Sequence, residues 1–219
     1  MHLKPGQRRQ PKQLRSRMMV ETIVEAAEQV FAETGYELAT TNQIAERAGI
    51  SIGSLYQYFP NKDALIFEVH KAHDDEQLRV VETCIAESRH LPFRDAIRLV
   101  IHTSLVNHSK SPKLYAAFEE WIPVATKLID RTDFEENMVM MLTEFLKERT
   151  LVSDGARLKP AIFVIMNMCR SVVHAFVHAG QTRFGHDEIA THLTDSILGC
   201  LKSFEGNGLE TSPNCGGSR

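Results

Sequence analysis

Residues 52–58 include no acidic residue, and four of them carry hydroxyl or amide groups: Ser54, Tyr56, Gln57 and Tyr58. The chemistry open to such groups is hydrogen bonding to a polar partner. A glutamine amide can pair at two points with an adenine edge, whereas a serine hydroxyl bonds to any base. Short or aromatic side chains free of acids also suit a helix that lies in the major groove against phosphates. These residues therefore predict a DNA-reading helix.

Two short helices at a steep angle are predicted to position these side chains. Thr40 and Gln43 form a capping box that begins the first helix. Ala45 is small enough for the second helix to cross closely, and Gly49 can adopt the positive φ that ends the first helix. Ser51 then caps the second helix. The pattern indicates a helix-turn-helix.

The second helix is predicted to stop at Pro60, and Asn61 caps the helix that follows. Lys62 lies in the first turn of that helix, where a cation is disfavoured by the helix dipole, so we expect it to serve another purpose, such as binding a phosphate. The apolar positions expected to pin both short helices onto a third are Ile44, Ala48, Ile50, Leu55 and Phe59.

Residues 15–70 resemble the DNA-binding domain of the TetR family of bacterial transcriptional regulators. The resemblance begins with the apolar helix that ends at Gly35 and runs through Leu-Tyr-Gln-Tyr-Phe-Pro-Asn-Lys. Many positions agree at fixed spacing: Gly35-Tyr36, Thr40-Thr41, Ala45, Ala48-Gly49, Leu55-Tyr56, Tyr58-Phe59 and Asn61-Lys62.

The resemblance implies roles for single residues. It implies phosphate contacts from Thr41, Tyr56, Tyr58 and Lys62, and base-edge reading from Ser54 and Gln57. A helical hairpin packed inside some other α protein is the alternative reading of this segment, although outward tyrosines beside a lysine are unusual on a merely solvated face.

Charge is distributed unevenly along the 219 residues. The formal net charge is −3, yet residues 1–18 hold six basic residues and no acid, and the other residues hold 19 basic and 28 acidic residues. Such polarity orients one face of a protein toward DNA. We expect residues 1–14 to form a disordered basic arm, and Arg15 and Arg17 to contact DNA from the first helix. A solubilising leader is the other interpretation of residues 1–10.

The fold class predicted is all-α, because strand-like alternation is missing. A helix-turn-helix domain is expected over 15–61, a larger helical ligand-binding and dimerisation domain over 62–205, and a flexible tail over 206–219. Helices of the larger domain are predicted at 62–88, from about 92 to 105, 114–121, 134–149, 160–179 and 189–204. Pro123 is expected to interrupt the third of these.

The segment 160–179 is apolar on nearly every side, so more than one neighbour must cover it. In the TetR family the last two long helices form a four-helix interface between two copies, and these two have the composition for it. The resemblance therefore implies a homodimer. A twofold dimer also fits a palindromic operator in double-stranded DNA, with two half-sites about one turn apart.

The resemblance further implies a small-molecule effector, largely apolar, inside the second domain. Methionine and aromatic side chains make adaptable apolar walls, although ordinary core packing is the favoured explanation for any single one of them. An arginine within an apolar helix needs an acidic partner, the dimer mate or an anionic ligand. The candidate ligand-binding residues are Phe118, Trp121, Met138, Met141, Phe163, Met166 and Arg170.

Enzymatic motifs are missing: there is no Gly-rich phosphate loop, His-Glu-x-x-His or Gly-x-Ser-x-Gly. We expect the protein to have no enzymatic activity and to bind no cofactor and no metal. Two pairs of histidines nevertheless have a helical spacing that could share a metal, namely His70 with His73 and His174 with His178. The four dispersed cysteines indicate a reduced, cytoplasmic setting, and no membrane segment is predicted. The function predicted is a ligand-released repressor. Alternatives are a ligand-promoted binder or activator, and a helical module that binds protein.

Overall fold

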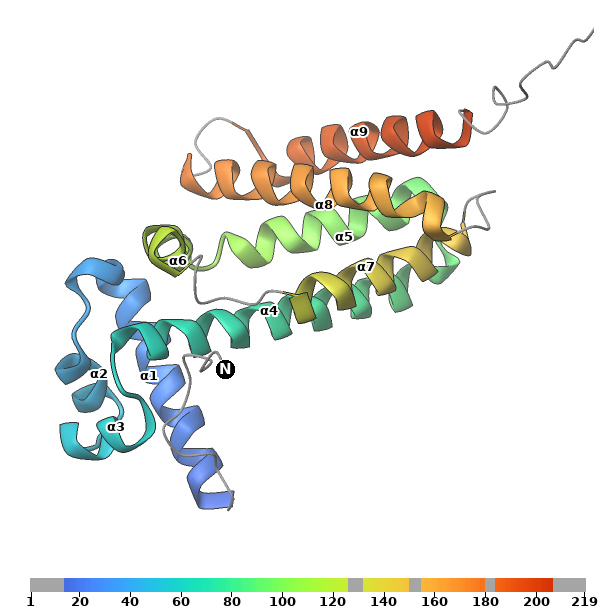
Figure 1. The fold of residues 1–219 in the computed structure, drawn as a ribbon. Coiled ribbons are helices and arrows are strands. Elements are labelled where there is room, and N and C mark those ends of the chain that lie inside the picture. The colour runs from blue at the N-terminus through green and yellow to red at the C-terminus, as the bar shows by residue number, and fades with distance from the viewer. Residues whose placement is uncertain (1–13, 126–131, 150–154, 180–183, 207–219) are drawn as a thin grey trace, which may run out of the picture. The chain divides into compact units, whose positions relative to one another are not determined.

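The computed structural model describes residues 14–125, 132–149, 155–179 and 184–206 (Figure 1). Within these residues every regular element is helical. Their order along the chain is α1 (Leu14–Leu38), α2 (Thr41–Arg47), α3 (Ile52–Tyr58), α4 (Lys62–Glu87), the short 3-10 helix η1 (Ser88–His90), α5 (Phe93–His108), α6 (Pro112–Ala125), α7 (Thr132–Lys147), α8 (Gly155–His178) and α9 (His186–Gly206). The all-α fold class is confirmed. The predicted basic arm and flexible tail lie outside the described residues, except for Leu14 at the start of α1 and Gly206 at the end of α9.

The chain divides into two compact units, and this division does not coincide with the domain boundary predicted after residue 61. The first unit comprises Met1–Arg79 with His108–Phe134, and the second comprises Val80–Asn107 with Glu135–Arg219. The first unit therefore adds the start of α4 and the whole of α6 to the helix-turn-helix. No sequence signal marks this division, because α4 runs without a break from one unit into the other.

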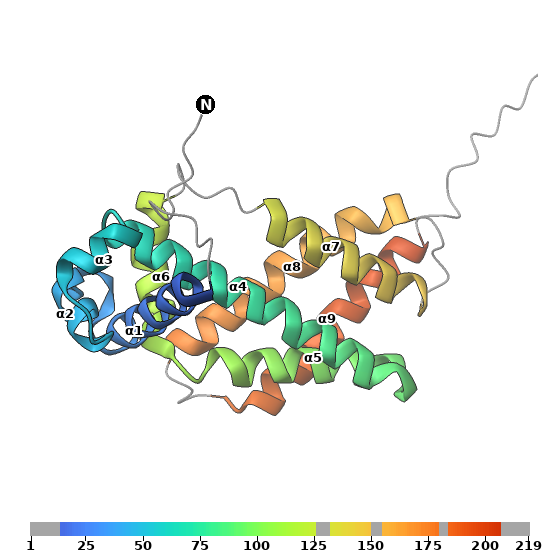
Figure 2. The same cartoon turned by 90° about the horizontal axis from the view of Figure 1, so that it is seen from below.

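The core of the first unit joins α1, α2, α3, the start of α4 and α6 (Figure 2). Ile44 and Leu55 are fully buried, as the sequence pattern predicts. Large side chains with almost no exposed surface include Ile23, Phe31, Phe59, Leu65, Ile66 and Trp121. The helix α6 packs along α1, which the sequence did not indicate.

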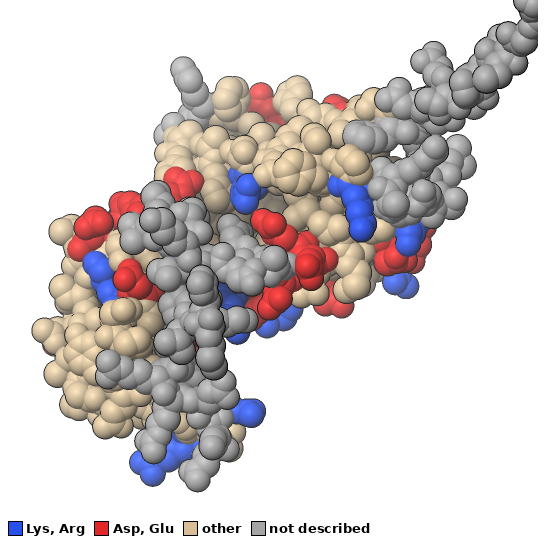
Figure 3. Space-filling view, viewed as in Figure 1, with Lys and Arg blue, Asp and Glu red and all other residues tan. Residues whose placement is uncertain are grey.

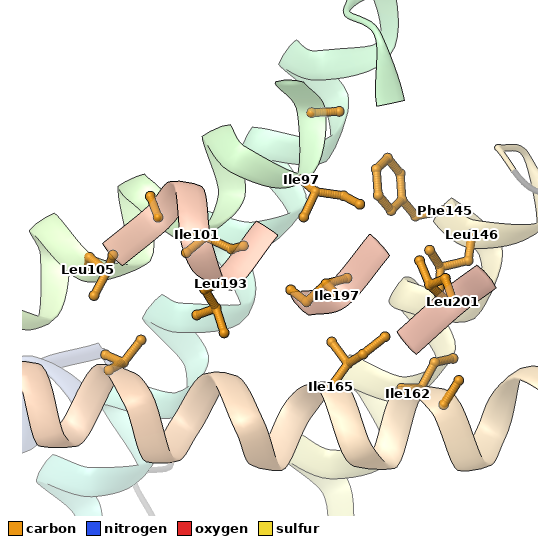
Figure 4. Close-up of a cluster of buried hydrophobic side chains, with 14 of the residues drawn as sticks. Ile97, Ile101, Leu105, Phe145, Leu146, Ile162, Ile165, Leu193, Ile197 and Leu201 are labelled. Carbon is orange, nitrogen blue, oxygen red and sulfur yellow. The ribbon is translucent and has the colours of Figure 1, made fainter. Parts of the chain in front are cut away.

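The second unit has a continuous apolar core between α5, α7, α8 and α9 (Figure 4). Every 3.6 residues an apolar side chain of each helix turns inward, so the four stripes meet. The labelled members are Ile97, Ile101, Leu105, Phe145, Leu146, Ile162, Ile165, Leu193, Ile197 and Leu201. The expected stripe of α5 is confirmed at Ile97, Ile101 and Leu105.

Two prolines lie inside helices where the sequence pattern predicted boundaries. Pro123 does not end α6, which continues to Ala125, and Pro160 is the sixth residue of α8 rather than its first. Each proline removes one backbone donor. Close to a helix end only a single intrahelical hydrogen bond is lost, so the helix continues through it.

Candidate nucleic-acid interface

Local hydrogen bonds build the helix-turn-helix as the sequence predicts. The side chain of Thr40 accepts from the backbone N–H of Gln43, and the Gln43 side chain accepts from the N–H of Thr40 at 2.9 Å, which completes the capping box. Gly49 has φ 68° and turns the chain toward α3. Ser51 caps α3 by accepting from the N–H of Ser54 at 3.1 Å. These contacts fix the start of both short helices.

The exposed side of α3 carries the residues expected to meet DNA. Tyr56 is 39% exposed, Gln57 is also exposed, and Ser54 and Tyr58 are half-buried. The surface over α2 and α3, at the left of Figure 3, is largely free of charged atoms. Gln57 is thus open to solvent, as a residue that reads a base edge requires.

Two hydroxyls from different helices lie together at this surface. The Oγ1 of Thr41 at the start of α2 and the phenolic oxygen of Tyr56 in α3 are 3.0 Å apart. Ser54 makes a similar pair with the N-cap residue of α3, with 2.9 Å between its Oγ and that of Ser51. Thr41 and Tyr56, which the resemblance assigns to phosphate, are therefore brought together. Ser54 is partly occupied by its helix cap.

The ammonium group of Lys62 makes contacts within the protein. It donates to the carbonyl oxygens of Tyr36 at 2.7 Å and Glu37 at 3.3 Å, and it lies 4.2 Å from the centre of the Tyr36 ring. These carbonyls belong to the last turn of α1, where a cation is favoured by the helix dipole. Lys62 thus ties the start of α4 to the end of α1.

Tyr36 is the centre of a network that the sequence did not reveal. Its hydroxyl donates to the carboxylate of Asp63, and its backbone N–H donates to Oε2 of Glu120 in α6 at 3.2 Å. Burial, followed by the hydrogen bond to Asp63, raises the pKa of Tyr36. Gly35 has φ 78° and breaks the helical path just before it.

A second network fixes α2 on α1. The guanidinium of Arg47 donates two hydrogen bonds to the carboxylate of Glu33, at 2.8 and 2.7 Å, and a third to Gln29 at 3.2 Å. The side-chain hydrogen bond from Arg47 lowers the pKa of Glu33. The basic residue on α2 is therefore engaged within the protein. Arg15 and Arg17 lie exposed at the start of α1, where Figure 3 shows basic atoms at the bottom of the view.

The candidate ligand-binding residues are divided between the two units. Phe118 and Trp121 are buried in the first unit, and Met138 is buried in the second. Met141 and Met166 are half-buried in the second unit. Phe163 is 68% exposed and Arg170 is also exposed, with its guanidinium donating to Asn167 at 2.7 Å. Phe163 and Arg170 therefore lie on the outer face of α8.

Redox and metal chemistry find little support in the described residues. Burial raises the pKa of the Cys169 thiol to about 12, so its reactive thiolate is scarce at neutral pH. Cys84 is buried, and Cys215 lies outside the described residues. Within the described part of the chain, no three side chains of His, Cys, Asp or Glu gather as metal ligands would.

Two family models match consecutive parts of the chain. The model of bacterial regulatory proteins of the TetR family matches residues 23–69, and the model of the tetracyclin repressor-like C-terminal domain matches residues 92–201. The chain belongs to the TetR family. Its membership accounts for the helix-turn-helix and for the helical second part together.

Individual TetR-family relatives agree with this result. The fatty acid metabolism regulator protein of Bacillus subtilis is 32% identical over 84 residues, which are 38% of this chain and 43% of that relative. A regulator structure from Mesorhizobium loti has TM-score 0.69 at 17% identity, covering 87% of this chain and 98% of that one. FadR of B. subtilis in complex with stearoyl-CoA has TM-score 0.57 at 21% identity, covering 84% and 98%.

One TetR-family helix, α8, also has a segment apolar enough to span a membrane. Leu158–His178 has mean hydropathy 1.5, and the core helix of a soluble protein passes the same test. Side chains of Leu158, Ile162 and Ile165 are buried in the core of the second unit. Only 33% of the apolar window is buried, so packing on the core of the second unit covers part of this segment.

Proposed function

We propose that this chain is a bacterial transcriptional repressor that binds a palindromic operator as a homodimer and is released by a small molecule. The observation that carries the proposal is α3: an acid-free face with exposed Tyr56 and Gln57, set by a capping box and a serine cap inside a TetR-family domain. A soluble protein of the cytoplasm fits this activity.

The DNA contacts we propose follow from the geometry of α2 and α3. Thr41 and Tyr56 present two hydroxyls 3.0 Å apart, a spacing at which both can bond to one phosphate group. Gln57 reads a base edge, and Tyr58 and Ser54 contribute from half-buried positions. Arg15 and Arg17 supply charge from the start of α1, which makes binding sensitive to salt.

For the homodimer we propose the outer faces of α8 and α9. Phe163 is 68% and Val164 is 46% exposed, which is unusual for neighbouring apolar residues in a monomer. On α9 the small residues Ser196, Gly199 and Ser203 are exposed at helical spacing, so a second helix can approach closely. A Phe163→Glu substitution is expected to convert the dimer to a monomer in size-exclusion chromatography with light scattering. A dimer that persists would contradict this interface.

The effector we propose is largely apolar. Among the candidate residues, Phe118 and Trp121 lie buried in the first unit, where they can supply apolar contacts. The structure of B. subtilis FadR holds stearoyl-CoA, and long-chain acyl-CoA is therefore one compound class to test. The exposed positions of Phe163 and Arg170 favour the dimer mate over the effector as their partner.

The test is fluorescence anisotropy of the purified protein on DNA from upstream of its own gene, at about 50 and 200 mM salt. We expect tight, salt-sensitive binding to one fragment and weaker discrimination by Gln57→Ala. Binding that is insensitive to salt, or that ignores DNA sequence, would contradict the proposal. Tighter binding after addition of an effector would instead identify a ligand-promoted regulator.

A further inference from the structure

The first two residues of α3 contribute little to the folded protein. This helix has only seven residues, Ile52–Tyr58, and its buried residue is Leu55. Ile52 has 37% of its surface exposed, and Gly53 is also exposed. Glycine is among the residues least favourable in a helix, and β-branched isoleucine is less favourable there than alanine or leucine. The fold alone therefore does not explain these two residue types at these positions.

Neither the backbone nor the available space requires a glycine at position 53. Among the described glycines, positive φ occurs at Gly35 and Gly49, so Gly53 has a φ that other residues adopt. A β-carbon built at Gly53 would lie 3.9 Å from the Oγ of Ser51, which is an ordinary van der Waals contact. An alanine would thus fit the folded protein and favour the helix. The missing side chain leaves room for a molecule that lies close against this turn.

Helical spacing places both residues beside the side chains proposed to meet DNA. Residues four apart are neighbours on a helix surface, so Ile52 lies next to Tyr56. The hydroxyl of Tyr56 is the one paired with Thr41 at 3.0 Å. By the same spacing Gly53 lies next to Gln57, which is exposed. The first turn of α3 therefore continues the surface that we propose to meet the operator.

The side chain of Ile52 limits what it can recognise. It has no polar atom, so it cannot form a hydrogen bond with a phosphate or with a base edge. In the major groove the apolar group of a base edge is the C5-methyl group of thymine. Covering one such methyl group with an apolar side chain raises affinity by about three- to fivefold. Tyr56 and Gln57 carry polar groups, so Ile52 is the exposed aliphatic side chain of α3.

We propose that Ile52 reads the C5-methyl group of a thymine in the operator, and that Gly53 lets this turn of α3 lie against the base edge. The inference rests on the proposed DNA-binding function. It gives α3 two kinds of selection: the amide of Gln57 selects by hydrogen bonds, and Ile52 selects by contact with a methyl group.

The first test removes the methyl group and the isoleucine separately and together. The probe is the operator that the parent protein selects from random synthetic DNA, with each thymine replaced in turn by deoxyuridine, which lacks only the methyl group. This DNA holds no 5-methylcytosine, so thymine is the only source of the group. Affinity is measured by fluorescence anisotropy for the parent, for Ile52→Ala and for Gln57→Ala.

We expect one replacement in each half-site to weaken binding of the parent by about three- to fivefold. Ile52→Ala should bind the thymine and deoxyuridine forms of that position equally, because the side chain that contacts the methyl group is gone. Gln57→Ala is the matched control and should still distinguish the two forms. The proposal is overturned if no thymine methyl group affects binding of the parent, or if Ile52→Ala keeps the same discrimination.

The second test adds a methyl group to the protein. We expect Gly53→Ala to have an unchanged or higher thermal unfolding midpoint, since alanine favours the helix, and to bind the operator at least about fivefold more weakly, since the new methyl group crowds the base edge. A lower midpoint would show that the fold itself requires the glycine. Operator affinity equal to that of the parent would show that α3 does not approach DNA closely at this turn. Either result would overturn the role of Gly53.

The same measurements separate this inference from the proposed function. If the parent selects an operator and binds it with salt sensitivity, but no methyl group depends on Ile52, only the inference falls. If the parent selects no sequence and binds no DNA at about 50 mM salt, the proposed function falls and the inference falls with it.

Discussion

The carboxylate of Glu120 accepts a hydrogen bond from the backbone N–H of Tyr36, at 3.2 Å and 84 residues away in sequence. The bond joins α6 to the point where Gly35 breaks the helical path of α1. A β-carbon placed at Gly35 would lie 3.6 Å from the same oxygen of Glu120, so the two helices approach closely here. The position of the last turn of α1 thus depends on α6.

Glu120→Ala leaves the N–H of Tyr36 without this acceptor, and we expect a loss of about 1 to 2 kcal/mol in the free energy of unfolding. Glu120→Gln is the matched control, because its amide oxygen can still accept from the N–H. Urea unfolding followed by circular dichroism measures both. A Glu120→Ala midpoint equal to that of the parent would show that the bond contributes nothing.

Gln57→Ala should relax the choice of one base pair by about 1 to 3 kcal/mol and leave the salt dependence of binding unchanged, since the glutamine is neutral. Arg15→Ala or Arg17→Ala should have the opposite effect. Affinity should fall equally for every DNA sequence, and the slope of log affinity against log salt concentration should become shallower by about one. Anisotropy titrations on single-base operator variants make the comparison. If all three variants showed the same dependence of affinity on salt concentration, the two arginines would not be part of the DNA interface.

Lys62→Met separates two roles of one side chain. If the ammonium group served only to bind phosphate, the variant would be as stable as the parent. Because the group donates to the carbonyl oxygens of Tyr36 and Glu37, we expect the free energy of unfolding to fall by about 1 to 2 kcal/mol in the absence of DNA. Lys71→Met, at an exposed position of the same helix, is the control. Thermal unfolding and operator binding are measured on both variants.

The ion pair between Glu33 and Arg47 predicts a stability that depends on pH. The pKa of Glu33 is lowered from 4.5 in the folded protein, so the contribution is present above that value and is lost as pH falls through the folded pKa. We expect Glu33→Gln to be less stable than the parent near pH 7, and the difference in stability to narrow as the pH falls below 4.5. A difference of constant size across this range of pH would argue against the pair.

The helix-turn-helix was predictable because its determinants are local. Thr40 with Gln43, Gly49, and Ser51 act within a few residues of their own positions, and the structure confirms each. Residues that act over long distances left no such signal. Glu120 is one of several acids in α6 or beside it, and nothing in its neighbourhood points to Tyr36. The pairing of α6 with α1 was missed for the same reason.

The candidate ligand residues show the same limit. Composition selected large flexible and aromatic side chains, but side chains of these types also fill cores and interfaces. Phe163 lies exposed and Trp121 is fully buried, although both are large apolar residues within helices.

The dependence of Tyr36 on Glu120 has a consequence for protein synthesis. A ribosome completes the helix-turn-helix long before it reaches α6, and at about 5 to 20 residues per second the 84 residues between the two partners take roughly 4 to 17 seconds. During that interval the nascent DNA-binding domain lacks one of the contacts that position the end of α1. A chain released early, after α4, would carry every residue that we propose to contact DNA and still hold these residues less firmly than the finished protein.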